Sequence, residues 1–164
     1  SDLYKDETQT DSGENYVNET VFESDLELLF PANYIPNDSE RIMIYRELDS
    51  MENDDRIEAF KAKLIDRFGK IPKRGEELIR IVTLRKIARK LGIEKVGLKS
   101  GKMTLFLVSQ KDSAYYQSEA FGRLLHFVQA NYKQTQLKEA GNRRSVIIDK
   151  VDSVKKAVEL LQTI

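Results

Sequence analysis

Apolar residues recur at helical spacing through the middle of the chain. In one stretch they lie three or four positions apart, which is the pattern of a helix that buries one stripe. The residues of that stripe are Ile57, Phe60, Leu64 and Phe68. Gly69 then permits the left-handed backbone that ends a helix, and Pro72 prevents its continuation. The pattern therefore predicts a helix that begins after Asn53 and ends at Phe68.

Two further helices flank this one. The first is predicted to begin with Asp38 or Ser39 as its N-cap and to run to about Met51. The third is predicted from about Gly75 to Leu91, with Gly92 as its C-terminal cap. The residues of the third helix that we expect to face inward are Leu78, Ile81, Leu84, Ala88 and Leu91.

Alternating apolar and polar positions predict strands on either side of these helices. An N-terminal strand is expected at 25–30, before Pro31. Four more strands and two helices form a repeated ββα pattern, with strands near 94–99, 102–108, 132–138 and 143–149, one helix at about 113–130 and a last helix after Asp152. The predicted fold is α+β, with an N-terminal strand and three helices packed on a (ββα)-(ββα) antiparallel sheet unit.

Charge is segregated along a chain whose net charge is zero. Residues 1–30 contain nine acidic residues and a single lysine, whereas 69–111 contain twelve basic residues. The first 22 residues have too few apolar side chains to offset the cost of ordering, so we expect them to be a disordered acidic linker. The remainder, 23–164, divides into a helical part at about 37–92 and the ββα–ββα part at about 93–164.

Catalytic motifs are missing from the sequence. It has no phosphate-binding loop of the Gly-x-x-x-x-Gly-Lys-Ser/Thr type and no Gly-x-Gly-x-x-Gly. There is no cysteine, and the only histidine, His126, is expected to face solvent on the 113–130 helix, without the partners that a catalytic triad needs. The acidic pairs Asp54-Asp55 and Glu76-Glu77 lie at predicted helix starts, where the helix dipole favours negative charge. We therefore expect no enzymatic activity, no metal and no cofactor in this chain.

Basic residues near the end of the third helix form the first of two candidate interaction surfaces. Arg85, Lys86, Arg89 and Lys90 lie in its last turns, where cations also complement the helix C-terminus. Contact with nucleic-acid phosphates is the functional alternative. A DNA- or RNA-binding module that uses the basic 80–102 surface is thus one hypothesis, although this stretch has no base-stacking aromatic residue.

Charged residues on the second helix form the other candidate surface. Lys63 and Arg67 are four positions apart and share a stripe beside the buried ladder, with Asp66 nearby. These residues are typical of a solvated helix flank. A charged docking stripe, in which Arg67 forks onto a carboxylate, is the functional alternative, but the residues by themselves favour the solvated flank.

The helix-ending run Leu64-Ile65-Asp66-Arg67-Phe68-Gly69, followed by Ile71-Pro72, resembles the C-terminal domain of bacterial transcription-repair coupling factors, the Mfd family of DNA translocases. Further matching segments are Tyr34-Ile35-Pro36, Glu40-Arg41 and Lys90-Leu91-Gly92-Ile93. The similarity extends from about Asp25 to Ile164 and is tightest over 34–93.

This resemblance implies a function that the residues alone do not. In that family the complete protein binds RNA polymerase stalled at a lesion, pushes on upstream DNA with an ATP-driven motor, and recruits the excision-repair protein UvrA. ATP and Mg belong to that motor and not to the C-terminal domain. The C-terminal domain folds back on the N-terminal module and hides its UvrA-binding surface. Residues 23–164 are then a C-terminal regulatory domain of a cytoplasmic protein, with no membrane partner.

The resemblance also implies which residues make the interdomain contact. The family uses a Glu and an Arg four positions apart in this helix, and Arg67 matches the Arg. Lys63 stands where the family has the Glu, so the charge at that position is reversed.

Overall fold

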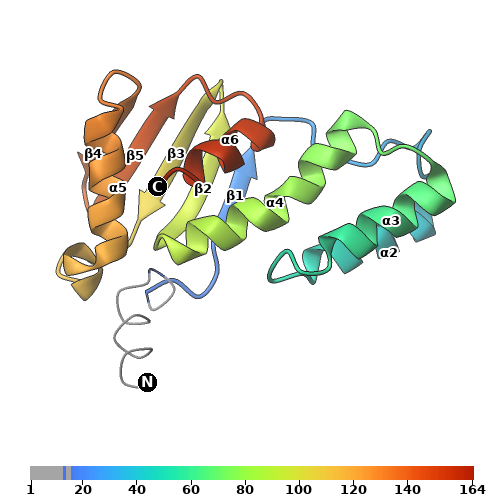
Figure 1. Ribbon diagram of the computed structural model, residues 1–164, viewed down its shortest axis with the longest axis horizontal. Helices are drawn as coiled ribbons and strands as arrows, with labels where there is room; N and C mark the ends of the chain where they lie inside the picture. Colours follow the sequence, from blue (N-terminus) through green and yellow to red (C-terminus); the bar gives the residue numbers. More distant parts are fainter. Residues whose placement is uncertain (1–12, 14–15) are drawn as a thin grey trace.

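The computed structural model describes residue 13 and residues 16–164. Within this part the α-helices are α2 (Asp38–Asp49), α3 (Ile57–Phe68), α4 (Lys73–Lys90), α5 (Glu119–Ala130) and α6 (Val154–Leu161), with a short 3-10 helix η2 (Ala114–Gln117) before α5. The strands are β1 (Val21–Ser24), β2 (Ile93–Lys99), β3 (Lys102–Leu107), β4 (Thr135–Ala140) and β5 (Arg143–Asp149). Helices α2 and α3 lie side by side at one end of the molecule, and α4 extends from them to the sheet (Figure 1).

The strands form a single five-stranded sheet in the order β1-β2-β3-β5-β4. Strands β2, β3, β5 and β4 are antiparallel, as the repeated ββα pattern predicts, and the α+β fold class is confirmed. Ser100 and Gly101, which join β2 to β3, both have positive φ angles, of 54° and 71°, as a tight two-residue hairpin turn requires. Helices α4, α5 and α6 cover one face of the sheet (Figure 1).

The N-terminal strand is displaced from its predicted position and adds a parallel edge to the sheet. Strand β1 occupies Val21–Ser24 and pairs parallel with β2, so the sheet is mixed and not purely antiparallel. Hydroxyl groups at both ends of β1 fix this pairing, because Thr20 Oγ1 donates to the Ile93 carbonyl at 2.7 Å and Ser24 Oγ donates to the Leu98 carbonyl at 2.8 Å. The predicted strand at 25–30 is wrong, since its alternating leucines pack on the core from a loop.

The boundary of the predicted acidic linker is also too late in the sequence. Val17 is only 5% exposed and belongs to the sheet core, and Thr20 is buried as well. Tyr16 packs edge-on against Tyr115, with their ring centroids 5.6 Å apart. The ordered domain therefore includes 16–22, and the rest of the predicted linker, residues 1–12, 14 and 15, lies outside the described residues.

Helix α4 separates two hydrophobic cores and contributes to both. Ile79 and Val82 pack in the core formed with α2 and α3, whereas Leu84 and Ala88 pack in the core beneath the sheet. The five residues predicted to face inward all pack on one of these two cores, but the prediction missed Ile79 and Val82. The apolar residues of α4 surround the helix because it is buried on two sides.

A buried carboxylate connects the two parts through α4 and α6. Glu77 accepts hydrogen bonds from the backbone N–H groups of Val154 and Lys155, at 2.9 and 3.0 Å, at the start of α6. Arg80 also donates to Glu77 at 3.1 Å. The prediction that Glu77 complements the start of its own helix is wrong, because Glu77 lies inside α4 and accepts from the N–H groups at the start of α6.

Candidate interaction groove

The start of α2 and the end of α3 are held in place by short-range polar contacts. The Asn37 side chain caps α2 by accepting from the Glu40 N–H at 2.9 Å, one position before the predicted cap. The Tyr34 hydroxyl donates to the Gly69 carbonyl at 2.8 Å, just after α3 ends. Gly69 has a φ of 84°, which confirms that this glycine terminates the helix with a positive φ. Among these contacts, the Tyr34 hydrogen bond joins the segment before α2 to the end of α3.

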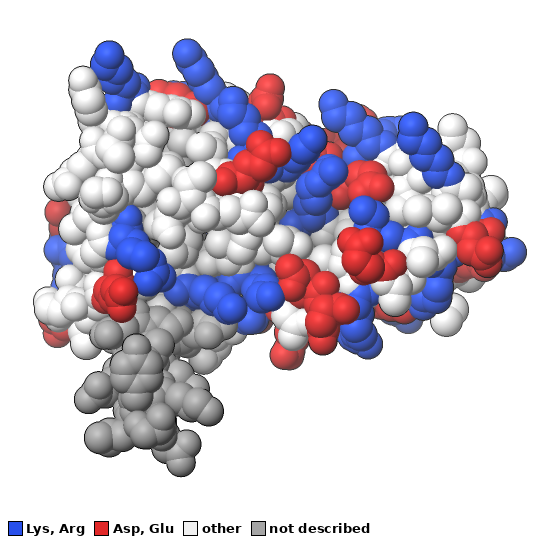
Figure 2. All heavy atoms as spheres, viewed as in Figure 1, with Lys and Arg blue, Asp and Glu red and all other residues white. Residues whose placement is uncertain are grey.

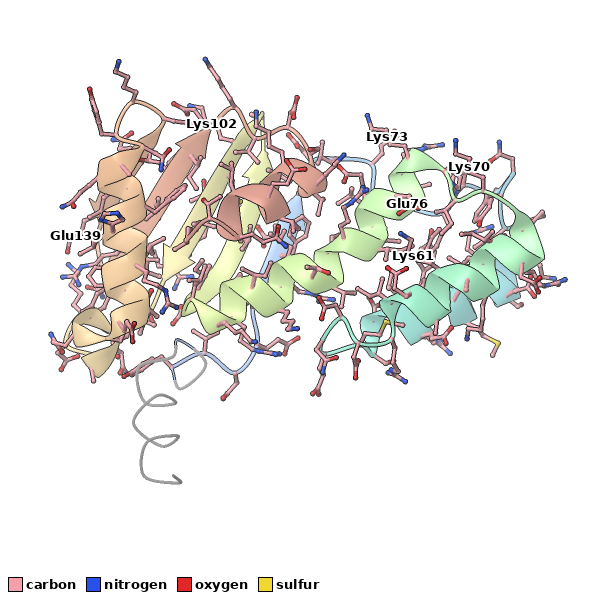
Figure 3. All side chains as sticks on the ribbon, viewed as in Figure 1. Lys61, Lys70, Lys73, Glu76, Lys102 and Glu139 are labelled. Carbon is pink, nitrogen blue, oxygen red and sulfur yellow. The ribbon has the colours of Figure 1, made fainter. Side chains whose placement is uncertain are left out.

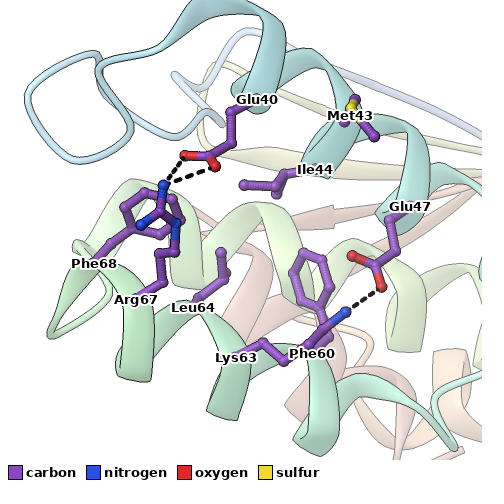
Figure 4. Close-up of a pocket in the computed structure, with 9 residues that line it drawn as sticks. All are labelled: Glu40, Met43, Ile44, Glu47, Phe60, Lys63, Leu64, Arg67 and Phe68. Carbon is purple, nitrogen blue, oxygen red and sulfur yellow. Dashed lines mark hydrogen bonds and ion pairs between the residues drawn. The ribbon is translucent and has the colours of Figure 1, made fainter.

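An open groove of about 400 Å³ runs between α2 and α3 (Figure 4). Its floor is apolar, because the buried Phe60 and Leu64 of α3 meet Ile44 of α2 there. Met43 lies on the rim and is 69% exposed. The residues that line the groove are Glu40, Met43, Ile44, Glu47, Phe60, Lys63, Leu64, Arg67 and Phe68.

Two ion pairs bridge the groove. Arg67 Nη2 contacts both carboxylate oxygens of Glu40, at 3.0 and 3.3 Å, and Lys63 Nζ contacts Glu47 Oε1 at 2.7 Å (Figure 4). The Arg67 guanidinium also lies 5.3 Å from the centroid of the Phe68 ring. Both cations remain about two-thirds exposed, at 66% for Arg67 and 67% for Lys63. Exposed pairs of this kind contribute only about 0–1 kcal/mol to stability, so a partner can exchange them at little cost.

The structure brings together two of the three residues predicted for the charged stripe. Lys63 and Arg67 line the same groove, whereas Asp66 is exposed on the side of α3 turned away from its buried stripe. The sequence reasoning missed the partners Glu40 and Glu47 on α2. Their seven-residue spacing, which places both on one helical face, is the signal that could have found them.

Two of the four basic residues proposed for nucleic-acid contact, Lys86 and Arg89, hold a loop of this same chain. Lys86 Nζ lies 2.8 Å from Asp54 Oδ1, and its hydrogen bond lowers the pKa of the Asp54 carboxyl. Arg89 donates to the Glu52 carbonyl at 3.4 Å. Arg85 and Arg89 line a hollow of about 370 Å³ together with residues 49–52. Arg85, Lys86 and Arg89 thus face the acidic connection between α2 and α3.

The only histidine and the most deeply buried tyrosine of the described part of the chain lie apart from the groove. His126 is exposed on α5, as expected. Among the described residues, no group of three or more His, Cys, Asp or Glu is arranged to hold a metal ion. The deeply buried Tyr115 has a raised pKa because burial disfavours its phenolate, and its hydroxyl donates to the Leu91 carbonyl at 2.7 Å. None of the described helices is long and apolar enough to cross a membrane.

Comparison with known proteins gives concordant matches. A family model described as the TRCF domain matches residues 24–118. The transcription-repair-coupling factor of Escherichia coli K12 is 36% identical over 78 residues, which cover 48% of this chain and 7% of that protein. The protein of the same name from Rickettsia typhi is 29% identical over 142 residues, covering 85% of this chain and 12% of its own length.

A solved structure shares the fold. The crystal structure of a C-terminal domain of transcription-repair coupling factor matches with a TM-score of 0.69 at 18% identity, over 88% of both chains. The chain described here spans only about a tenth of the length of the curated relatives it matches.

Proposed function

This chain belongs to the TRCF domain family of transcription-repair coupling factors, and on that premise we propose that it is a non-catalytic, autoinhibitory interaction domain. In the parent protein it docks on the N-terminal module and covers the surface that recruits UvrA. The parent is the ATP- and Mg-dependent DNA translocase that displaces stalled RNA polymerase at lesions. This chain contributes to that activity through contacts and performs no chemistry itself.

The groove between α2 and α3 is the observation that supports this proposal best. Its apolar floor and the largely exposed Met43 give a partner surface to bury, and burial of apolar area is the main source of association energy. Arg67 presents a planar guanidinium at one end of the groove, where it can form two parallel hydrogen bonds to a carboxylate. The residue that the family resemblance assigns to the contact thus lies where a docking partner would meet it.

The charge reversal at Lys63 fits the same docking surface. The carboxylate of Glu47 lies 2.7 Å from Lys63 Nζ, on the opposite wall of the groove. A carboxylate therefore lies beside Lys63 in the groove, although it belongs to Glu47 of α2 and not to α3. We propose that Glu47 takes the part that the family's Glu takes on α3, and that Lys63 orients it.

Autoinhibition of this kind is a difference in free energy between a closed and an open parent protein. UvrA binds only the open form. Its apparent affinity is therefore the affinity of the open form multiplied by the fraction of molecules that are open. Any substitution that weakens the groove contact raises that fraction. The effect on UvrA binding should therefore be opposite in sign to the effect on docking.

The test measures UvrA affinity of the full-length parent protein at constant salt. Arg67→Ala should tighten UvrA binding, and deletion of the residues corresponding to 23–164 sets the upper limit of the gain. The matched control is Arg123→Ala on α5, which removes an exposed arginine that pairs with Glu119 far from the groove. If the wild type, the Arg67→Ala variant and the deletion bind UvrA equally, autoinhibition by this domain is wrong.

Nucleic-acid binding through α4 is the second candidate function, and the contacts favour it less. Lys86 and Arg89 already hold the loop at 52–54. A phosphate ligand would have to displace those contacts. This preference would be reversed if the isolated domain bound DNA with an affinity that falls steeply with rising salt, and if Lys86→Ala abolished that binding.

A further inference from the structure

A second groove lies on the other flank of α3, away from Lys63 and Arg67. It has a volume of about 860 Å³ and is formed where the end of α3, the start of α4 and the start of α6 meet. The residues that line it are Ile65, Lys70, Ile71, Pro72, Lys73, Glu76, Arg80 and Lys155. Basic side chains gather over the start of α4 in the space-filling view (Figure 2). Ile65 and Arg67 are two positions apart on α3, so the two grooves occupy different sides of the helix.

The lysines of this second groove are not neutralised by neighbouring carboxylates. Glu76 is engaged by Lys61 at 3.2 Å, and the two side chains point toward one another between α3 and α4 (Figure 3). In contrast, Lys70, Lys73 and Lys155 form no ion pair with any residue that the structure describes. All three are exposed. The groove therefore has an excess of positive charge in a chain whose net charge is zero.

The helix start at the same place adds to the positive field. Pro72 occupies the N-cap position of the 18-residue helix α4, and no side chain caps the helix there. The first backbone N–H groups of a helix carry partial positive charge, which favours an anion nearby. This field acts together with the lysine side chains and does not by itself define a site.

Apolar surface lies between the charges. Ile65 is 50% exposed although it is a large aliphatic residue, and Pro72 is partly exposed next to it. Ile65 and the lysines line the same groove, so an apolar contact there would be enclosed by a polar rim, which is the layout of a protein interface. The groove has no aromatic side chain in its lining on which a nucleic-acid base could stack.

We propose that this groove binds an acidic peptide segment of a partner protein, with an aliphatic side chain packed on Ile65 and Pro72. Carboxylates of the peptide pair with Lys70, Lys73 and Lys155. Because the groove lies on the flank of α3 opposite to Arg67, the peptide and the module that docks between α2 and α3 can be bound at the same time. The proposal is thus independent of the autoinhibitory role.

The test titrates the isotope-labelled chain with synthetic peptides and follows its backbone amide NMR signals. The probe is a glutamate-rich peptide with leucines at helical spacing, and a second peptide has alanine in place of each leucine. We expect the leucine peptide to shift the signals of Ile65, Lys70, Lys73 and Lys155. The double variant Lys70→Glu, Lys155→Glu should weaken binding by about tenfold or more, since like charges then face the peptide. Ile65→Ala should weaken binding of the leucine peptide and leave binding of the alanine peptide unchanged.

Matched controls separate this surface from general charge effects. Lys133 and Lys138 are exposed at the opposite end of the molecule, and Leu137 is 47% exposed there. The double variant Lys133→Glu, Lys138→Glu makes the same change in net charge, and Leu137→Ala removes the same amount of aliphatic surface. Neither should alter the affinity.

Several results would overturn the proposal. Absence of binding would do so, as would equal affinity for the leucine and alanine peptides. Tighter binding of an oligo-dT strand, competing for the same signals, would make the groove a phosphate site. If Arg67→Ala weakened binding of the peptide and the Lys70→Glu, Lys155→Glu variant did not, the peptide would occupy the α2–α3 groove instead.

Discussion

Replacing Glu77 with alanine should destabilise the domain far more than the same change at its neighbour Glu76. Glu77 is buried, and its two carboxylate oxygens accept the N–H groups of Val154 and Lys155 at 2.9 and 3.0 Å. Glu76 forms an ion pair with Lys61 near the surface. The two positions differ in burial and in partner, and the residue type is the same.

The magnitude follows from the groups that lose a partner. The hydrogen bond at the Val154 N–H is buried, and a buried donor without an acceptor costs about 1–3 kcal/mol. A carboxylate at a partly buried helix N-terminus contributes up to about 2 kcal/mol more. Glu77→Ala should therefore cost about 3 kcal/mol. For a chain of this size that corresponds to a fall of about 6–12 °C in the melting temperature.

Urea unfolding of the wild type and three variants measures the difference. Glu77→Gln keeps one acceptor oxygen but no charge, so it should cost about half as much as Glu77→Ala. Glu76→Ala should stay within about 1 kcal/mol of the wild type, because it removes only a surface pair. A Glu77→Ala variant as stable as the wild type, or no more affected than Glu76→Ala, would refute the role of this carboxylate in joining α4 to α6.

Three further outcomes are expected. Phe60→Ala should cost about 3–5 kcal/mol in denaturant unfolding because it opens a cavity beneath α3, whereas Ile65→Ala on the exposed flank should stay within about 0.5 kcal/mol; equal costs would mean that α3 is turned the other way. Deleting residues 1–20 should lower the melting temperature measurably, because Val17 leaves the sheet core, and an unchanged thermal transition would contradict a stabilising role of this segment. Asp54 has a folded-state pKa below its ordinary value of 3.8, so its contribution to stability is complete above that pH and is lost as pH falls through the folded pKa. The stability difference between wild type and Asp54→Asn should therefore be present at neutral pH and disappear in acid, and a difference independent of pH would contradict the ion-pair explanation.

Local patterns in the sequence were sufficient for most of the secondary structure and for the family. The end of α3 at Phe68 and the hairpin turn at Ser100-Gly101 depend on interactions between residues close in sequence, so apolar spacing and glycine positions predict them. The same local run, which ends in Gly69 and Pro72, carried the resemblance that the TRCF domain match confirms. The positions of Lys63 and Arg67 on one flank of α3 also follow from helical spacing alone.

Only the tertiary structure decided which surfaces those residues form. Strand β1 pairs with β2 across more than 70 residues of chain, and no local pattern specifies such a partner. The same holds for α4, whose two buried sides depend on cores at both of its flanks. Arg67 meets Glu40 because α2 and α3 pack side by side, which turns a charged stripe into the wall of a groove. Contacts between distant segments depend on how the elements pack, and the periodicity of one element contains no information about its neighbours.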